Sequence, residues 1–186
     1  ANRRLAPARP TVAGAASSYI SDPAAPVMDL YDGDYGAHDY RALQERGDVL
    51  TFETAPLAAD VEVIGAMRAQ LWVETDARDV DLYVKVLDVA PDGTALNLMA
   101  PGREVLRASY RDITRRQLLE PGRTYLLEWN DLFTANRFAK GHRIRVQVFS
   151  SFLPHYSVNP QTGESESVSA ATQKARVTIR HDAEHP

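Results

Sequence analysis

The sequence predicts an all-β fold in which two packed antiparallel sheets form a jelly-roll sandwich. From Asp48 onward, apolar and polar residues alternate with a period of two, as in strands that bury one face and keep the other in water. Turn signals rich in proline and glycine separate these stretches. No segment has a convincing helical period, and residues 112–119 could form one or two turns at most. Two sheets packed face to face are the economical way to bury so many half-apolar strands.

The predicted strands differ in how cleanly they alternate. Four keep their apolar residues on one face, and they cover residues 66–74, 80–86, 143–148 and 174–180. Two others, at 50–52 and 125–129, are shorter or less regular. Turns are predicted at 91–93, 100–102 and 121–122.

Residues 1–47 differ in kind from the rest and are predicted to form an extended connector, with the sandwich domain at 48–186. Alanine, proline, serine, glycine and aspartate dominate this segment. Its prolines fix the backbone φ angle and remove hydrogen-bond donors, which disfavours regular structure. A free linker would not usually carry tyrosines at positions 19, 31, 35 and 40. We therefore expect the connector to lie along a surface, either that of its own domain or that of a neighbouring one.

Composition narrows the classes of function. The 186 residues carry a formal net charge of −4, from 21 Lys and Arg against 25 Asp and Glu. This mild acidic excess gives no general attraction to nucleic acid or to an anionic membrane, and no apolar run approaches the ~20 residues of a membrane span. The absence of cysteine excludes disulfides and thiol chemistry. We expect neither a nucleic-acid nor a membrane partner; a cytoplasmic location is favoured, with export of a longer precursor as the alternative.

The sequence lacks the Gly-x-Ser-x-Gly elbow that exposes a catalytic serine beside backbone donors. The nearest candidates for a serine–histidine unit are Ser150 with His155 and Ser151 with His142, but nothing in their spacing supports one. Two serines at the end of a strand ordinarily bond to backbone groups in a turn. We therefore expect no catalytic residue in this chain.

Two patterns could suggest a metal. Residues 181–185 spell H-x-x-E-H, the order of the inverted zinc proteases, but that chemistry needs both histidines on one helical face and these follow a strand. Asp76, Asp79 and Asp81 could offer oxygen ligands to calcium; the alternative is a polar turn that leads into a strand. We expect no metal site and no cofactor.

Trp72 and Trp129 are predicted to lie on the faces opposite the apolar sides of their strands. An exposed tryptophan on a sandwich can be covered by another domain, because exposed aromatic patches mark interaction surfaces. It can also stack on a sugar, or it can simply be buried at the edge of the sandwich. The alternative function is therefore a stand-alone β-sandwich module that binds carbohydrate or protein.

Motifs near the C-terminus occur in a distinctive order: GHR at 141–143, SSFLP at 150–154 and NPQTG at 159–163. Further stretches of the same kind are YISDPAAPV at 19–27 and LRASYR at 106–111. This set resembles the C-terminal β-domain of the cocaine-esterase / X-Pro dipeptidyl-peptidase (CocE/NonD) family of serine hydrolases. The resemblance covers the chain from about residue 19 to its end.

The resemblance implies a galactose-binding-like jelly roll that follows an α/β-hydrolase domain. The catalytic serine, aspartate and histidine of the family lie in that other domain, and none transfers to a position here. It further implies that this module packs on the α/β-hydrolase domain as its partner and helps wall the substrate cleft of an acyl-ester or X-Pro-peptide hydrolase.

Candidates for cleft or domain-interface contacts lie in the connector and in the loop that follows residue 150, because binding residues concentrate on loops held by a rigid scaffold. They are Tyr35, Asp39, Arg41, Phe152, His155, Tyr156 and Asn159, together with Trp72 and Trp129. The alternative for Asp39, Arg41 and Arg107 is a set of internal ion pairs that hold the connector to the sandwich.

Domains of this family usually continue into a short final strand, whereas this chain stops at His185-Pro186. A missing edge strand would expose unpaired backbone groups to another chain. Homodimerisation through an exposed edge strand is therefore a hypothesis from the sequence.

Overall fold

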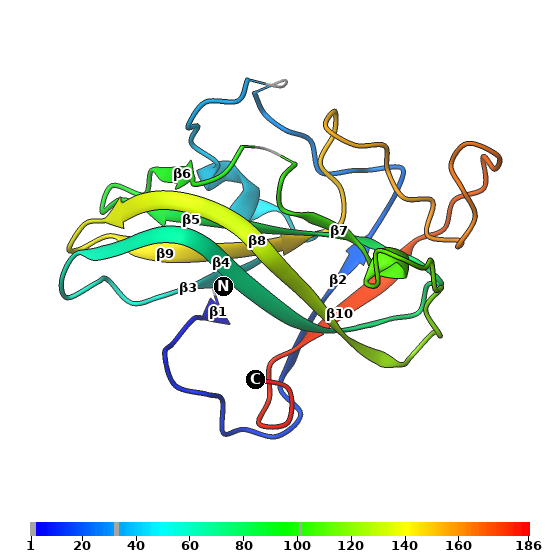
Figure 1. Cartoon of the computed structure of the whole chain (residues 1–186), viewed down its shortest axis with the longest axis horizontal. Coiled ribbons are helices and arrows are strands. Elements are labelled where there is room, and N and C mark those ends of the chain that lie inside the picture. Colours follow the sequence, from blue (N-terminus) through cyan, green and yellow to red (C-terminus); the bar gives the residue numbers. More distant parts are fainter. Residues whose placement is uncertain (1–2, 32–33, 101) are drawn as a thin grey trace.

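Two β-sheets make up the fold (Figure 1), and the alternating sequence accounts for both. The computed structural model describes residues 3–31, 34–100 and 102–186. The strands are β1 (Arg3–Arg4), β2 (Ala16–Ser21), β3 (Leu50–Glu53), β4 (Val61–Thr75), β5 (Asp81–Val89), β6 (Ala95–Asn97), β7 (Val105–Arg107), β8 (Thr124–Phe138), β9 (Arg143–Phe149) and β10 (Ala175–Arg180). Two short 3-10 helices, η1 (Arg41–Glu45) and η2 (Ala108–Tyr110), interrupt the β structure.

The six-stranded sheet has the order β1-β3-β9-β5-β6, with β7 also paired to β5, and the four-stranded sheet has the order β2-β10-β4-β8. Strand pairing is antiparallel except between β1 and β3. The prediction of an all-β sandwich of two sheets is confirmed. Among the described residues, no helix has the length and apolarity needed to cross a membrane.

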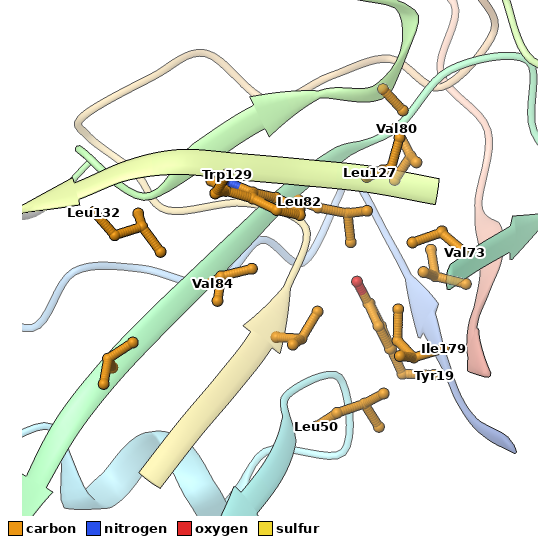
Figure 2. Close-up of a cluster of buried hydrophobic side chains, with 14 of the residues drawn as sticks. Tyr19, Leu50, Val73, Val80, Leu82, Val84, Leu127, Trp129, Leu132 and Ile179 are labelled. Carbon is orange, nitrogen blue, oxygen red and sulfur yellow. The ribbon is translucent and has the colours of Figure 1, made fainter. Parts of the chain in front are cut away.

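The main core lies between the two sheets. Leu82 and Val84 of β5 face Val177 of β10 and Leu127 of β8 across this space, and each is at most 1% exposed. Figure 2 shows labelled members of this cluster pointing into the gap between the strands. Burying a side chain of this size contributes about 1.5–3 kcal/mol relative to leaving it in water. The period-two pattern therefore positions the inner faces of both sheets.

A second apolar layer covers the other face of the six-stranded sheet. Tyr83 and Leu87 of β5 point outward there, and the connector covers them with Tyr40 and Leu43. Strand β5 is consequently buried on both faces, with eight of its nine residues buried. The prediction that the face of this strand carrying Asp81, Tyr83 and Lys85 is wet is wrong, because the connector forms a third layer over it.

The N-terminal part of the connector is itself a strand of the sandwich. Residues 16–21 pair along their whole length with β10, and Ser17, Tyr19 and Ser21 point into the protein while their neighbours are exposed. The predicted connector, residues 1–47, therefore includes a strand that is built into the four-stranded sheet. Serines obscured the alternation, since they occupy both its inward and its outward positions.

The last strand is not at the edge of its sheet. β10 pairs with β2 on one side and with β4 on the other, so β2 and β8 are the edges of the four-stranded sheet. The open edge expected beside the last strand is therefore closed by β2, a strand that the sequence did not reveal. The homodimer stays a prediction, but no open edge beside β10 supports it.

Candidate docking face

Four exposed apolar or aromatic side chains gather where the connector meets the loop after β9. Met28, Leu30 and Tyr35 of the connector are 47, 53 and 71% exposed, and Tyr156 of the loop is 48% exposed. We call these four residues the connector face. In Figure 1 the part of the connector that follows β2 (lighter blue to cyan) and the loop after β9 (orange) lie along the same side of the molecule.

Backbone hydrogen bonds join the two segments beneath this face. Met28 and Leu153 form a parallel bridge, in which Asp29 N donates to Leu153 O at 2.6 Å and Leu153 N donates to Val27 O at 3.1 Å. Val27 N in turn donates to Ser151 Oγ at 2.9 Å. The loop and the connector therefore hold each other in place beneath Met28.

A buried carboxylate anchors the same junction. Asp29 Oδ2 lies 2.6 Å from His155 Nε2, and the two side chains are 0 and 7% exposed. Tyr40 donates its hydroxyl to Asp29 Oδ1 at 2.9 Å. Burial alone would raise the pKa of Asp29, but the hydrogen bonds from His155, Tyr40 and the backbone of Tyr31 outweigh it and hold the pKa below its ordinary value. The carboxylate is thus kept charged and joins the connector to the loop.

Phe152 is the centre of an aromatic cluster under the face. Its ring centroid lies 5.5 Å from that of Phe149, 6.0 Å from that of Tyr40 and 5.3 Å from that of His155. Lys85 Nζ sits 4.7 Å from the Phe152 ring and 4.3 Å from the Tyr40 ring. The Lys85 ammonium group therefore lies over two aromatic rings, whose negative faces stabilise a cation.

The Lys85 ammonium group also forms an ion pair with Glu104. Lys85 Nζ donates to Glu104 Oε1 at 2.8 Å, and both side chains are only 1% exposed. Trp129 Nε1 donates to the backbone oxygen of Glu104 at 3.0 Å, which fixes the acid from the core side. A buried pair of this kind is costly to break, because either partner alone would be an uncompensated charge.

The charged candidates of the connector make internal contacts. Asp39 Oδ1 accepts hydrogen bonds from the backbone N–H groups of Ala95 at 2.9 Å and of Arg41 at 3.1 Å. Arg41 bonds to Asp39 Oδ2 and donates to Thr94 Oγ1 at 2.6 Å. These contacts tie the connector to the residues at the start of β6. A cleft role for Asp39 and Arg41 stays a prediction.

A second polar group lies beside Tyr156. Arg107 donates to Asp81 at 2.8 and 3.0 Å and to Glu166 at 3.2 Å. Buried Asn159 donates to the same Asp81 at 2.8 Å. A depression of about 280 Å³ is lined by Asp81, Arg107, Glu166 and Tyr156, among others. Arg107 and Asn159 therefore hold the loop after β9 to β5 and β7 next to the connector face.

Comparison with known protein families identifies the family to which this domain belongs. Residues 5–186 match the profile of the X-Pro dipeptidyl-peptidase C-terminal non-catalytic domain. The chain belongs to this family. The predicted resemblance to the CocE/NonD β-domain is confirmed.

Relatives of this C-terminal domain are parts of larger hydrolases. The cocaine esterase of Rhodococcus sp. (strain MB1 Bresler) is 40% identical over 155 residues, a match that covers 80% of this chain and 26% of that protein. An aminopeptidase from the marine sediment archaeon Thaumarchaeota archaeon has a TM-score of 0.87 at 30% identity, and an α-amino acid ester hydrolase has 0.83 at 30%. Each match covers 96% of this chain and 33% of the solved one. The chain thus spans about a third or less of these relatives.

The two tryptophans of the domain differ from each other. Trp72 points outward as predicted, and its ring packs edge-on against His185 at 5.0 Å. Trp129 is only 3% exposed and belongs to the main core, so its predicted exposure is wrong. Trp129 lies two residues after Leu127, so alternation along β8 places both in the core. A bulge, in which Asn130 and Asp131 oppose Arg68, then lets Leu132 point inward as well. Trp129 is therefore unavailable for stacking on a sugar.

The serine–histidine pairs considered from the sequence do not form. Ser150 bonds to the Tyr19 hydroxyl at 2.7 Å, and Ser151 accepts the backbone N–H of Val27. His155 pairs with Asp29, and His142 Nδ1 lies 2.8 Å from Asp88. Both serines therefore serve the packing of β2 and of the connector.

The C-terminal histidines and the acidic run likewise have separate partners. His181 Nε2 lies 2.9 Å from Ser17 Oγ, and His185 Nδ1 lies 2.9 Å from Asp182. Asp79 accepts from Ser109, and Asp76 accepts from the backbone of Arg176. No group of three His, Cys, Asp or Glu residues suited to a metal occurs in the described ranges.

Sequence reasoning missed Asp29, Lys85 and Glu104, which organise the junction. Lys85 resembled an ordinary solvent-facing residue of an alternating strand. The neighbours of Lys85 in the sequence could have revealed its burial, because the stretch from Leu82 to Leu87 has apolar or aromatic residues on both faces. Such a stretch indicates a strand that is covered twice.

Proposed function

We propose that the chain is the non-catalytic C-terminal module of a serine hydrolase that acts on acyl esters or X-Pro peptides. In this proposal the connector face packs on the α/β-hydrolase domain and helps wall its substrate cleft. Family membership supports the non-catalytic role, and the names of the relatives span ester and peptide hydrolysis.

The observation that carries the docking role is the connector face itself. Met28, Leu30, Tyr35 and Tyr156 expose apolar surface together, next to the internally paired Arg107 and Glu166. An apolar patch with a polar rim is typical of a surface that another protein part covers. The ordered junction below the patch lowers the entropy cost of binding, since few side chains need to be fixed on contact.

In a shared active site, such a module acts by position. Rigid aromatic side chains at the rim would exclude water and limit the shape of the acyl or peptidyl group. The nucleophile, its base and the oxyanion donors would come from the α/β-hydrolase domain. This division of roles agrees with the engagement of Ser150 and Ser151 in packing contacts.

The docking role is tested by titrating the purified chain with the separately purified α/β-hydrolase domain of the parent protein, followed by calorimetry. Leu30→Asp should weaken binding at least tenfold, because it places a charge in the apolar contact. The matched control is Ile64→Asp on β4, a residue that is 81% exposed on the four-stranded sheet, outside the connector face. Equal affinities for the two variants would exclude the connector face as the docking surface.

A further inference from the structure

A polar row crosses the outer face of the six-stranded sheet beneath the connector. Thr51 of β3 is in register with Gln147 of β9, and Gln147 is in register with Lys85 of β5. The three residues are 3, 0 and 1% exposed. Residues directly opposite each other on neighbouring strands have Cβ atoms about 5 Å apart, so these side chains form one continuous line. Glu104 extends it through its bond to Lys85.

The row has more hydrogen-bonding capacity than its protein neighbours use. Thr51 Oγ1, both amide atoms of Gln147, and Glu104 Oε2 are buried without a hydrogen-bonding partner among the residues that the structure describes. Arg145 Nη1, on the same face of β9, is in the same condition. Buried polar side chains in folded proteins nearly always bond to protein or to ordered water. Several unpaired atoms in one row therefore point to a bound molecule.

The chemistry of these atoms favours a neutral molecule that both donates and accepts. Glu104 Oε2 and Gln147 Oε1 are acceptors, Gln147 Nε2 and Arg145 Nη1 are donors, and the Thr51 hydroxyl is both. A cation would satisfy only the acceptors and an anion only the donors. Water satisfies all of them, and a buried water typically makes two to four such bonds.

The protein also provides a route and space. A pocket of about 270 Å³ lies between the end of η1 and β3, and Thr51 is part of its wall. Since a water molecule takes up about 30 Å³ in the liquid, this pocket has room for several. Its lining is mostly polar, with residues 44–47 on the side of η1. The pocket thus adjoins the row at the Thr51 end, where the hydroxyl itself is buried.

We propose that ordered water molecules enter from this pocket and bind along the polar row, where they bridge Thr51, Gln147 and Glu104. The connector is then joined to the sheet in two ways. Around Phe152 the contact is aromatic, and along the row it is made through bound water. This water site is independent of the proposed docking role, because the row lies under the connector and not on its exposed face.

The direct test is a crystal structure of the 186-residue chain at a resolution that shows ordered water. We expect water oxygens within about 2.7–3.2 Å of both Gln147 amide atoms. A map in which the Gln147 amide bonds only to protein groups, with no water in the row, would overturn the proposal.

Thermal unfolding gives an independent test. Gln147→Leu removes both amide atoms at similar size, and the loss of water bridges should lower the midpoint by about 2–4 °C. In a dry row the same change would remove unpaired buried groups and raise the midpoint, so an unchanged or higher value contradicts the proposal. The control is Gln70→Leu, whose exposed side chain bonds to Glu128 on the other sheet; it should shift the midpoint by about 1–2 °C at most. If Gln147→Leu does not fold, Thr51→Val is interpreted in the same way.

Discussion

The two faces of the six-stranded sheet are buried in different ways. The inner face meets the second sheet through aliphatic side chains such as Leu82 and Val84, each at most 1% exposed. The outer face is covered by the connector and the loop after β9, and this layer contains aromatic rings, a buried ion pair and a buried carboxylate with three donors. The inner contact depends on shape and area, whereas the outer one depends on specific pairs. The two layers should therefore respond differently to the loss of one side chain.

The largest expected effect is at the buried ion pair. Lys85→Met leaves Glu104 charged and unpaired between β5 and the connector, which should lower the free energy of unfolding by about 3–5 kcal/mol. Adding Glu104→Leu removes the orphan charge, and the double variant should recover most of the loss, because well-packed apolar groups can replace a buried pair. Chemical denaturation of the three proteins measures this recovery.

The inner face supplies the control for that experiment. Leu82→Ala should cost about 2–5 kcal/mol through lost burial and a residual cavity. Adding Glu104→Leu to Leu82→Ala should lower the stability further, because it restores no contact at Leu82 and leaves Lys85 as an uncompensated buried charge. If Lys85→Met and its double variant were equally unstable, the outer layer would depend on packing in the same way as the core.

A smaller effect is expected at Asp29, where the contrast can be measured with pH. Asp29→Asn weakens the bonds from His155 and Tyr40 and should cost roughly 1–3 kcal/mol near neutral pH. Because folding lowers the pKa of Asp29, its stabilisation is complete above the ordinary value of 3.8 and is lost as the pH falls through the lower folded pKa. The difference in unfolding free energy between wild type and variant should therefore shrink below that pH.

Asp131→Asn is the matched control, because Asp131 is exposed on β8. It should change stability by no more than about 0.5 kcal/mol at any of these pH values. A wild-type minus Asp29→Asn difference that stays constant down to acid would show that the carboxylate charge does not hold the connector.

The same contrast explains what could be predicted from the sequence. The inner face follows from alternation alone, so the strands that carry Leu82, Val146 and Val177 were found. Trp129 was placed on the wrong face because its strand carries leucines at both 126 and 127, so the period did not show which of the two points inward. Lys85 was misplaced because its burial depends on the connector, whose own contacts are side-chain pairs with partners distant in sequence, such as Asp29 with His155.

Only part of the candidate site could be predicted from the sequence. Resemblance to a family pointed to the connector and to the loop after β9, and the structure brings Tyr35, His155 and Tyr156 of these segments together. Phe152 and Asn159, chosen with them, are buried and support the face from below. Whether a loop residue is a contact or a support depends on which side of the backbone another layer covers, and local sequence carries no such information.

The smallest expected effect is at the serines that join these layers. A fluorophosphonate should give no adduct by intact mass, and a nitrophenyl ester should not be turned over by the purified chain. The physical reason is that Ser150 bonds to Tyr19 and Ser151 to the backbone of Val27, so neither hydroxyl has the general base that activates a nucleophile. A stoichiometric adduct at either residue would show that this junction opens to expose a reactive serine, and the outer layer would then be part of an active site instead of a support for one.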